Sequence, residues 1–424
     1  MRTLNHTPFP LVPRNTVVTP PALSLTFVLK GSFAIKPDAP CEIAKEQQPI
    51  SGEKTFMDEI GRSLSWSTDL APFKPHTDFF VFGHFHQPGG RPAPEGRASF
   101  ELGPLHKELT FFGPRVATKF DDRTWQIGPA EPMTQVPLRW EFSFGGLADR
   151  RNPMGKGIDA LPGTVPPAIA LPQIEDPRAP LRQPGDRPIP ANFAPMPSRF
   201  SARRRKLGTR DQRWQVFRAP LPPDDYDPSY HNAAPPDQQA GNYPRGDEKL
   251  ILRNLHPTIA ELVTYLPGLR PRLALLRQTD AGVVAEEVTL HLDTIVALPD
   301  EDQIVLLWRG VTPIRTRFIP DEVLMTECDM EALGPVSKLD DMPAKLLAKY
   351  LADQGASTKE DAEQDAQTLA EIHKLLAKAD LPPAVMQAAQ AEKDPVALYQ
   401  LLSTHMDKVL AELSAKYSLP YPPP

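Results

Sequence analysis

Residues 23–35 carry the pattern that most constrains the fold, because apolar and polar side chains alternate there over a full strand length. Phe27 and Phe33 belong to the apolar set, whereas Lys30 and Ser32 belong to the polar set. This period of two predicts a β-strand with one buried face and one polar face. Further short runs rich in strand-forming residues are separated by Pro, Gly or Asp. They lie at residues 78–85, 98–102, 106–112, 139–144, 250–252, 261–266, 272–277, 283–292 and 303–309.

Proline limits how these strands are connected. The chain has 52 Pro in 424 residues, more than twice the usual share of about 5%. Because 40% of the residues are apolar, we expect the prolines in ordered loops and at strand edges. Many short strands with proline-rich turns predict a mainly β fold, an antiparallel β-sandwich or barrel-like core with long ordered loops at about 147–248.

The longest irregular stretch runs from Gly208 to Lys249. It contains seven Pro, one Trp, three Tyr and many Asp, and it shows neither a helical nor a strand-like apolar period. Loops longer than about 15 residues inside a domain are usually functional, disordered or linking, and so many aromatic residues argue against disorder. The sequence therefore predicts an ordered, proline-stiffened loop laid over a β core.

Composition changes near Lys338, after which Ala, Leu, Lys, Glu and Gln dominate. Asp341 and Pro343 predict the start of a helix, and further apolar positions recur every three or four residues. The sequence thus predicts a β-rich region at 1–336 and a small α-helical bundle at 337–424, packed on itself, on the β part or on a partner.

Charge and composition disfavour several classes of function. The formal net charge is −6, so neither nucleic acid nor an anionic membrane is favoured as a partner. The basic run Arg203–Lys206 lacks interleaved aromatic residues and predicts a solvated turn. No apolar run reaches the roughly 20 residues of a membrane-spanning helix. Cys41 and Cys328 form no CxxC pair, and we expect a cytoplasmic protein.

The sequence offers two candidate sites for chemistry. His84 and His86 share one face of a predicted strand, with His76 and Asp78 upstream. Because no second ligand pair has a recognisable spacing, we expect no metal and no cofactor. The other candidate is a set of loop carboxylates, Asp224, Asp225, Asp227, Asp237, Asp247 and Glu248. They could bind Ca²⁺ or act as a general acid and base, but Asp beside Pro and Gly more often caps turns.

Seven strings occur in this chain in the same order as in a known bacterial family. They are WSTDLAPFKPHTDFFVFG (66–83), PLRWEFSFGG (137–146), NPMGKG (152–157), LPQIEDP (171–177), GTRDQRW (208–214), AAPPDQQ (233–239) and LDTIVALPDEDQIVLLWRG (292–310). From about Leu4 to Gly310 the chain resembles the type VI secretion effector adaptor or chaperone family, formerly a domain of unknown function, which is encoded beside VgrG and PAAR genes.

This resemblance implies a non-enzymatic adaptor that binds a toxic effector and helps to load it onto the VgrG and PAAR spike. No catalytic residue carries over. The matching positions that are candidates for partner contact or loop framework are Trp214, Pro222, Asp224, Asn232, Asp237, Gln238 and Gly246. The alternative hypothesis is a carbohydrate-active or other hydrolytic β-sandwich enzyme that uses the loop carboxylates.

Overall fold

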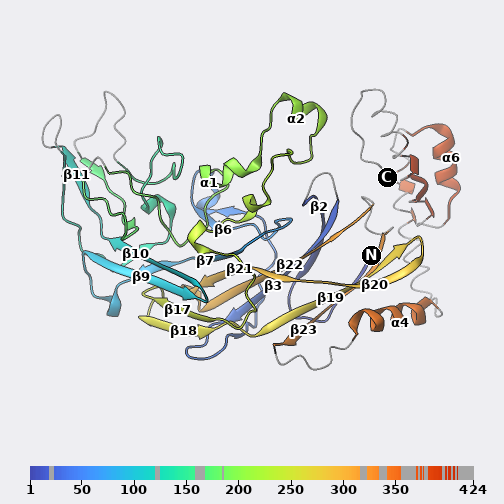
Figure 1. Cartoon of the computed structure of the whole chain (residues 1–424), viewed down its shortest axis with the longest axis horizontal. Coiled ribbons are helices and arrows are strands. Elements are labelled where there is room, and N and C mark those ends of the chain that lie inside the picture. Colours follow the sequence, from blue (N-terminus) through green and yellow to red (C-terminus); the bar gives the residue numbers. More distant parts are fainter. Residues whose placement is uncertain are drawn as a thin grey trace.

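The structure is a computed structural model of the whole chain. It describes residues 1–18, 23–119, 125–157, 168–183, 186–315, 322–333, 341–354, 369, 370, 373, 374, 376, 381–393, 397, 398, 400–402, 404, 405 and 408. The fold is mainly β, as predicted, and is built from several sheets with helices near the C-terminal end (Figure 1). Within the described residues no sheet closes into a barrel, so the sandwich form of the prediction applies.

Three large sheets make the core. The seven-stranded sheet contains β16 (Gln239–Ala240), β7 (Thr77–Val81), β21 (His291–Leu298), β22 (Gln303–Pro313), β3 (Ser24–Ala34) and β2 (Leu11–Thr16) in that order, with β4 (Glu42–Ile43) paired to β3. The five-stranded sheet has the order β15 (Ile174–Glu175), β10 (Leu105–Phe112), β9 (Glu95–Leu102), β17 (Lys249–Arg253) and β18 (Glu261–Tyr265). The four-stranded sheet has the order β1 (Arg2–Asn5), β23 (Val323–Ala332), β19 (Leu269–Thr279) and β20 (Gly282–Val288).

Smaller ribbons complete the sheet structure. They are β12 (Trp125–Ile127) with β11 (Val116–Lys119) and β14 (Ala168–Ala170), β13 (Gln135–Pro137) with β8 (His84–His86), and β5 (Lys54–Thr55) with β6 (Leu64–Trp66). Pairing is mostly antiparallel, but β1 runs parallel to β23 and β7 runs parallel to β21. The sandwich is therefore mixed rather than purely antiparallel.

The seven-stranded sheet is buried on both faces. Phe27 of β3 and Phe79 of β7 contribute to one large core that includes side chains of all three sheets, such as Phe100 and Leu273. The opposite face forms a second apolar cluster that includes Phe80. Loop residues and the end of β6 cover this cluster, and the covering side chains are Ile50, Trp66, Ala233 and Ala234.

Strand β3 confirms the strand predicted at residues 23–35, but its polar face is not solvated. Thr26, Lys30 and Ser32 are each 1% exposed or less. Lys30 Nζ donates to Asp69 Oδ2 at 2.9 Å, and Thr26 Oγ1 donates to the Pro72 carbonyl at 2.9 Å. The covering loop supplies these partners, so burying polar side chains is compatible with a stable fold.

Three predicted strands are wrong in detail. The strand predicted at 283–292 covers most of β20, a break at residues 289 and 290, and the start of β21. Residues 139–144 form a 3₁₀-turn, η3 (Trp140–Phe142), although every second residue there is aromatic. The Trp140 backbone N–H donates to Ser63 Oγ at 2.8 Å instead of to a neighbouring strand. Residues 78–85 divide into β7 and β8, because Gly83 lies between them at φ +113°, a conformation that favours glycine.

Two C-terminal helices are described in full. Helix α4 (Met342–Gln354) begins after Asp341, whose side chain accepts from the Ala344 N–H at 3.0 Å, as the predicted cap requires. Leu346 packs on Ala274 and Leu276 of β19, so α4 docks on the four-stranded sheet. Helix α6 (Pro383–Ala391) belongs to a separate apolar cluster. The predicted boundary at 336/337 and much of the helical bundle predicted at 337–424 lie outside the described residues. None of the described helices has the length and apolar character that crossing a membrane requires.

Candidate functional site

The stretch 208–249 is described throughout and divides into parts that are held differently. Residues 208–227, here called the arm, include helix α2 (Gln212–Phe217), which extends away from the sheets at the top of Figure 1. Residues 228–240, here called the anchored segment, include the 3₁₀-turns η5 (Pro228–His231) and η6 (Pro236–Gln238) and the edge strand β16.

A buried ion pair holds the start of the anchored segment. Lys74 Nζ lies 2.8 Å from Asp78 Oδ2, and the two side chains are 1% and 0% exposed. The Asp78 carboxylate also accepts from Asn232 Nδ2 at 3.0 Å, from the Ala233 N–H at 3.0 Å and from the Ala234 N–H at 3.2 Å. One carboxylate of β7 thus fixes three consecutive residues over the second face of the seven-stranded sheet.

A buried lysine holds the end of the same segment. Lys107 Nζ of β10 donates to Gln238 Oε1 at 2.7 Å, to Asp237 Oδ1 at 2.9 Å and to the Asn192 carbonyl at 2.9 Å. Burial lowers the pKa of Lys107, and the charge of Asp237 opposes that effect. The Gln238 amide also donates to the carbonyls of Phe79 and Phe193, both at 2.9 Å. Each of the three hydrogens of the Lys107 ammonium group therefore has an acceptor, which indicates a structural role for Lys107.

The basic run Arg203–Lys206 is not a purely solvated turn, contrary to the prediction. Arg203 is 2% exposed and donates to the carbonyls of Met196 at 2.7 Å and Tyr230 at 3.0 Å.

His231 follows Tyr230 in the anchored segment. Burial and the nearby charge of Arg203 lower the pKa of His231 to about 3. His231 is therefore neutral in the folded protein at physiological pH.

The arm is held by its own residues. Asp211 caps α2 by accepting from the Trp214 N–H at 2.8 Å, and the Trp214 indole N–H donates to the Leu221 carbonyl at 2.8 Å. Asp225 accepts from the Thr209 N–H at 2.8 Å and from its hydroxyl at 2.7 Å, so the two ends of the arm are joined. These bonds close the loop on itself. Near the end of the arm, Tyr226 also packs on His231, and the Asp227 N–H donates to the Lys206 carbonyl at 2.9 Å.

The remaining predicted positions have structural partners too. Arg218 pairs with Asp224 at 2.7 Å and donates to the Pro222 carbonyl at 3.4 Å. Gly246 lies at φ +98°, and its carbonyl accepts from the Gly268 N–H at 2.7 Å. The glycine thus permits the left-handed turn that leads into β17.

The loop carboxylates have separate partners. Asp224 pairs with Arg218, Asp225 binds Thr209, Asp227 accepts from the Ser229 N–H at 2.8 Å, and Asp237 binds Lys107. Although burial alone raises the pKa of Asp227, its hydrogen bonds with Ser229 keep that pKa below its usual value. These are the contacts expected of turn-stabilising carboxylates, whereas a glycosidase pair faces a common cleft at about 5 to 9.5 Å.

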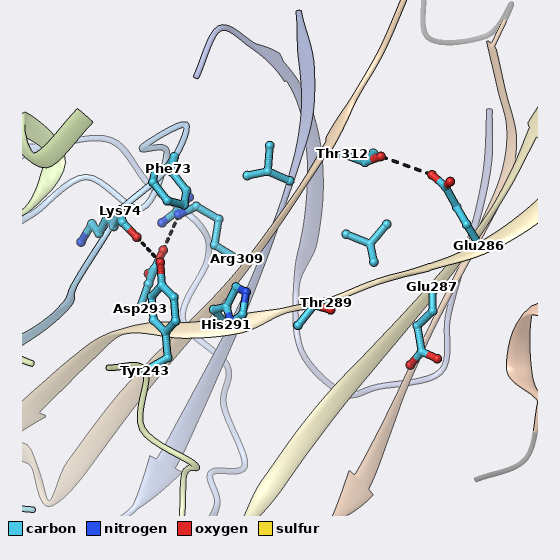
Figure 2. A pocket seen from close by; sticks show the side chains of 12 residues that line it. Phe73, Lys74, Tyr243, Glu286, Glu287, Thr289, His291, Asp293, Arg309 and Thr312 are labelled. Atoms are coloured by element: carbon cyan, nitrogen blue, oxygen red, sulfur yellow. Dashed lines mark hydrogen bonds and ion pairs between the residues drawn. The ribbon is translucent and has the colours of Figure 1, made fainter. Parts of the chain in front are cut away.

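The end of the stretch borders a cavity of about 360 Å³ (Figure 2). Tyr243 donates to the Lys74 carbonyl at 2.6 Å and stacks on His291 with ring centroids 4.3 Å apart. Burial raises the pKa of Tyr243 to about 12, so its hydroxyl stays protonated. Beside it, Arg309 Nε donates to Asp293 Oδ2 at 2.6 Å. Ion pairing and stacking thus hold the polar groups at this end of the cavity.

The predicted histidine group is divided by the structure. His84 and His86 both bind Asp300, whereas Asp78 lies in the buried network with Lys74. The His76 carbonyl accepts from Asn232 Nδ2 at 2.7 Å. Asp300 was missed because it lies 216 residues from His84 in the sequence.

The seven predicted positions therefore fall into two groups. Asn232, Asp237, Gln238 and Gly246 hold the loop to the body of the protein, and Trp214, Pro222 and Asp224 shape the arm. Sequence reasoning missed Val216 and Phe217, which are 55% and 49% exposed on α2. Two adjacent apolar residues in a helix outside the core were the available signal.

Comparison with known proteins identifies a family. Residues 22–309 match the model described as "Uncharacterized protein conserved in bacteria (DUF2169)", and this span is more than half of the chain. The chain belongs to this bacterial family. Neither the curated proteins nor the solved structures contain a match. The arm, the anchored segment and Asp300 all lie inside the family region, whereas α4 and α6 lie outside it.

Proposed function

We propose that the protein is a non-enzymatic cytoplasmic adaptor that binds a type VI secretion effector and helps to load it onto the VgrG or PAAR spike protein. The proposal starts from the seven strings that resemble the adaptor family, and the single structural observation behind it is the self-supported arm. A loop that is ordered before binding loses little conformational entropy when a partner docks.

The exposed surface of the arm is suited to a protein partner. Val216 and Phe217 expose apolar side chains on α2, and Trp214 is half-buried beside them. Isolated apolar side chains on a surface are common, but an aromatic residue on a projecting element matches the usual centre of a protein interface. The internal bonds of the arm keep this surface in one conformation.

Charge narrows the chemistry of that partner. Arg210 and Arg213 are exposed within the arm, but so are Asp211, Asp224, Asp225 and Asp227. The arm is thus an apolar patch surrounded by charges of both signs. We expect the effector to present an apolar surface bordered by complementary charges of both signs, because complementary charges speed association and exclude wrong partners.

The test begins with recovery of the tagged protein from its native host and identification of a large toxin-like protein together with VgrG or PAAR. Binding of that purified effector is then measured for wild type and for Val216→Asp/Phe217→Asp. We expect the double variant to bind at least tenfold more weakly, since loss of a central apolar contact costs about 2 kcal/mol or more.

Ile43→Asp is the matched control. Ile43 is 47% exposed, close to the 49% of Phe217, but lies on β4. Its effector affinity should equal that of wild type, and wild-type affinity should fall as ionic strength rises. An arm variant with undiminished affinity would exclude the arm as the docking surface. Turnover of a small substrate by the purified protein would overturn the adaptor function itself.

A further inference from the structure

We propose that His84, His86 and Asp300 form a binding site for a divalent transition-metal ion, with Zn²⁺ as the expected metal. One nitrogen of each imidazole and one oxygen of the carboxylate all lie within 4.8 Å of one another. Two imidazoles and a carboxylate are a frequent protein ligand set for zinc and related ions. This site is independent of the adaptor function proposed above.

The two histidines are aligned by strand geometry. They lie two residues apart on β8 and therefore point to the same side of the strand. Phe85 between them points the other way, is fully buried and stacks on Phe111 with ring centroids 4.5 Å apart. Pairing with β13 and the bond from the His86 N–H to the Asn254 carbonyl at 2.9 Å hold β8 on both edges.

The carboxylate comes from a rigid turn. Asp300 lies in η7 (Pro299–Glu301), which joins β21 to β22, and the strand pair closes directly around it at Leu298 and Gln303. Gly83 makes room for this side chain, because a Cβ at position 83 would lie 2.8 Å from Asp300 Oδ2. Each of the three proposed ligand side chains thus extends from a backbone segment that other contacts hold in place, as a metal site requires.

The distances suit an ion after a small adjustment. His84 Nδ1 lies 2.7 Å from Asp300 Oδ2, and His86 Nε2 lies 2.8 Å from Asp300 Oδ1. Bonds of about 2.1 Å in a tetrahedral arrangement separate ligand atoms by about 3.4 Å. The ligand atoms must therefore move apart by less than about 1 Å. The side chains of His84 and Asp300 are 33% and 27% exposed, so they have room for this movement.

The surroundings leave space for a further ligand. His84 and Asp300 border a cavity of about 390 Å³ whose wall also contains Trp66, Arg139 and Glu301. Structural zinc ions usually have four protein ligands, whereas three protein ligands leave a position for water or another group. We therefore expect the fourth position to face this cavity and to exchange its ligand.

The test is a titration of the purified, chelator-treated full-length protein with Zn²⁺ against a competing chromophoric chelator, and with Co²⁺ followed by visible absorption. We expect one Zn²⁺ per chain. His84→Ala, His86→Ala and Asp300→Asn should each weaken Zn²⁺ binding by roughly 10-fold to 100-fold or more. Substitution of residues that only hydrogen-bond to metal ligands already costs that much, and these three residues would be ligands themselves. Asn has nearly the same shape as Asp, so Asp300→Asn should fold like wild type, and circular dichroism verifies this.

His6→Ala is the matched control, because His6 Nε2 lies 2.8 Å from Glu327 Oε1 in a single histidine–carboxylate pair. This variant should bind Zn²⁺ like wild type. Wild-type protein that takes up no stoichiometric ion would mean that the three side chains form only a hydrogen-bonded cluster, and the proposal would fail. Unchanged binding by a folded His84→Ala/His86→Ala variant would also overturn it, by placing the ion elsewhere.

Discussion

The arm and the anchored segment follow one another in the chain and are both rich in Pro, but they are held in opposite ways. The anchored segment is tied to Asp78 and Lys107, which belong to the sheets. The arm is tied to itself through Asp211 and Asp225. The first arrangement makes the loop part of the fold, and the second leaves an ordered surface free for a partner.

The difference predicts how substitutions divide between stability and binding. A buried charged group stabilises only while its partner remains, because an isolated buried charge is very costly. Exposed loop bonds contribute little to global stability, since water replaces them when they break. Variants of the anchored segment should therefore change unfolding, and variants of the arm should change local order and partner affinity.

The largest effect is expected for Asp78→Ala. It leaves the Lys74 ammonium buried without its charge partner, removes the acceptor of the Ala233 and Ala234 N–H groups and removes one of the two acceptors of Asn232 Nδ2. We expect the free energy of unfolding to fall by about 3–5 kcal/mol, measured by urea denaturation. Asp224→Ala is the control, because its side chain is 84% exposed and its ion pair is worth about 0–1 kcal/mol. Equal losses would contradict the distinction between the two regions.

The next effect is expected for Gln238→Leu. The substitution preserves approximate size but removes the side-chain donor to the Phe79 carbonyl, one of the two donors to the Phe193 carbonyl and one acceptor of Lys107. Because buried polar groups then lack hydrogen-bond partners, we expect the free energy of unfolding to fall by about 2–4 kcal/mol. Gln215→Leu on the exposed surface of α2 provides the same chemical change without burial. A similar unfolding midpoint for both variants would rule out the role assigned to Gln238.

Acid should weaken the anchored segment through His231. Its pKa is about 3 in the folded protein, below the ordinary value of about 6.5 for an unfolded chain. Between these values the unfolded state binds a proton that the folded state does not, so stability contributed by neutral His231 is complete above about pH 6.5 and is lost as pH falls.

The measurement compares wild type with His231→Phe in urea at several pH values. Relative to the variant, wild type should lose up to ~1.4 kcal/mol per pH unit below about pH 6.5. The variant keeps an aromatic ring near Tyr226 and Tyr230 but cannot titrate. A constant difference across this pH range would show that His231 is not the responsible group.

Much of the fold was predictable from local sequence, because alternation reports which side chains leave a strand on which side. It predicted β3, β9, β10, β17, β18, β19 and β22, with shifts at their ends. It failed for the polar face of β3, because the partner that makes Lys30 tolerable in the interior is Asp69, 39 residues away. It failed for residues 139–144, because the alternation of aromatic residues does not show that the backbone forms a 3₁₀-turn there. The Trp140 N–H donates to Ser63, which is distant in the sequence, rather than to a neighbouring strand.

The candidate site was predictable only as a region. Pro and Asp density located the stretch 208–249, but nothing local distinguishes Asp237, which binds Lys107, from Asp225, which closes the arm. The distinction depends on residues more than 100 positions away for the first and only 16 for the second. The H-x-H pair was visible, whereas its third member, Asp300, became apparent only when the chain was folded.

The smallest effect on stability, and the sharpest test of the arm, is expected for Asp225→Ala. Asp225 joins the two ends of the arm through Thr209, and these hydrogen bonds lower the pKa of its carboxyl group. Removing it should leave the global unfolding midpoint unchanged, because the bonds are exposed, but should open the arm and speed tryptic cleavage after Arg213 and Arg218. Limited proteolysis under native conditions measures this rate, with Asp247→Ala as the control, because Asp247 pairs with Arg245 outside the arm. Slow cleavage in both variants would mean that Asp211 and Trp214 alone order the arm, whereas a lowered unfolding midpoint would mean that the arm is part of the cooperative fold.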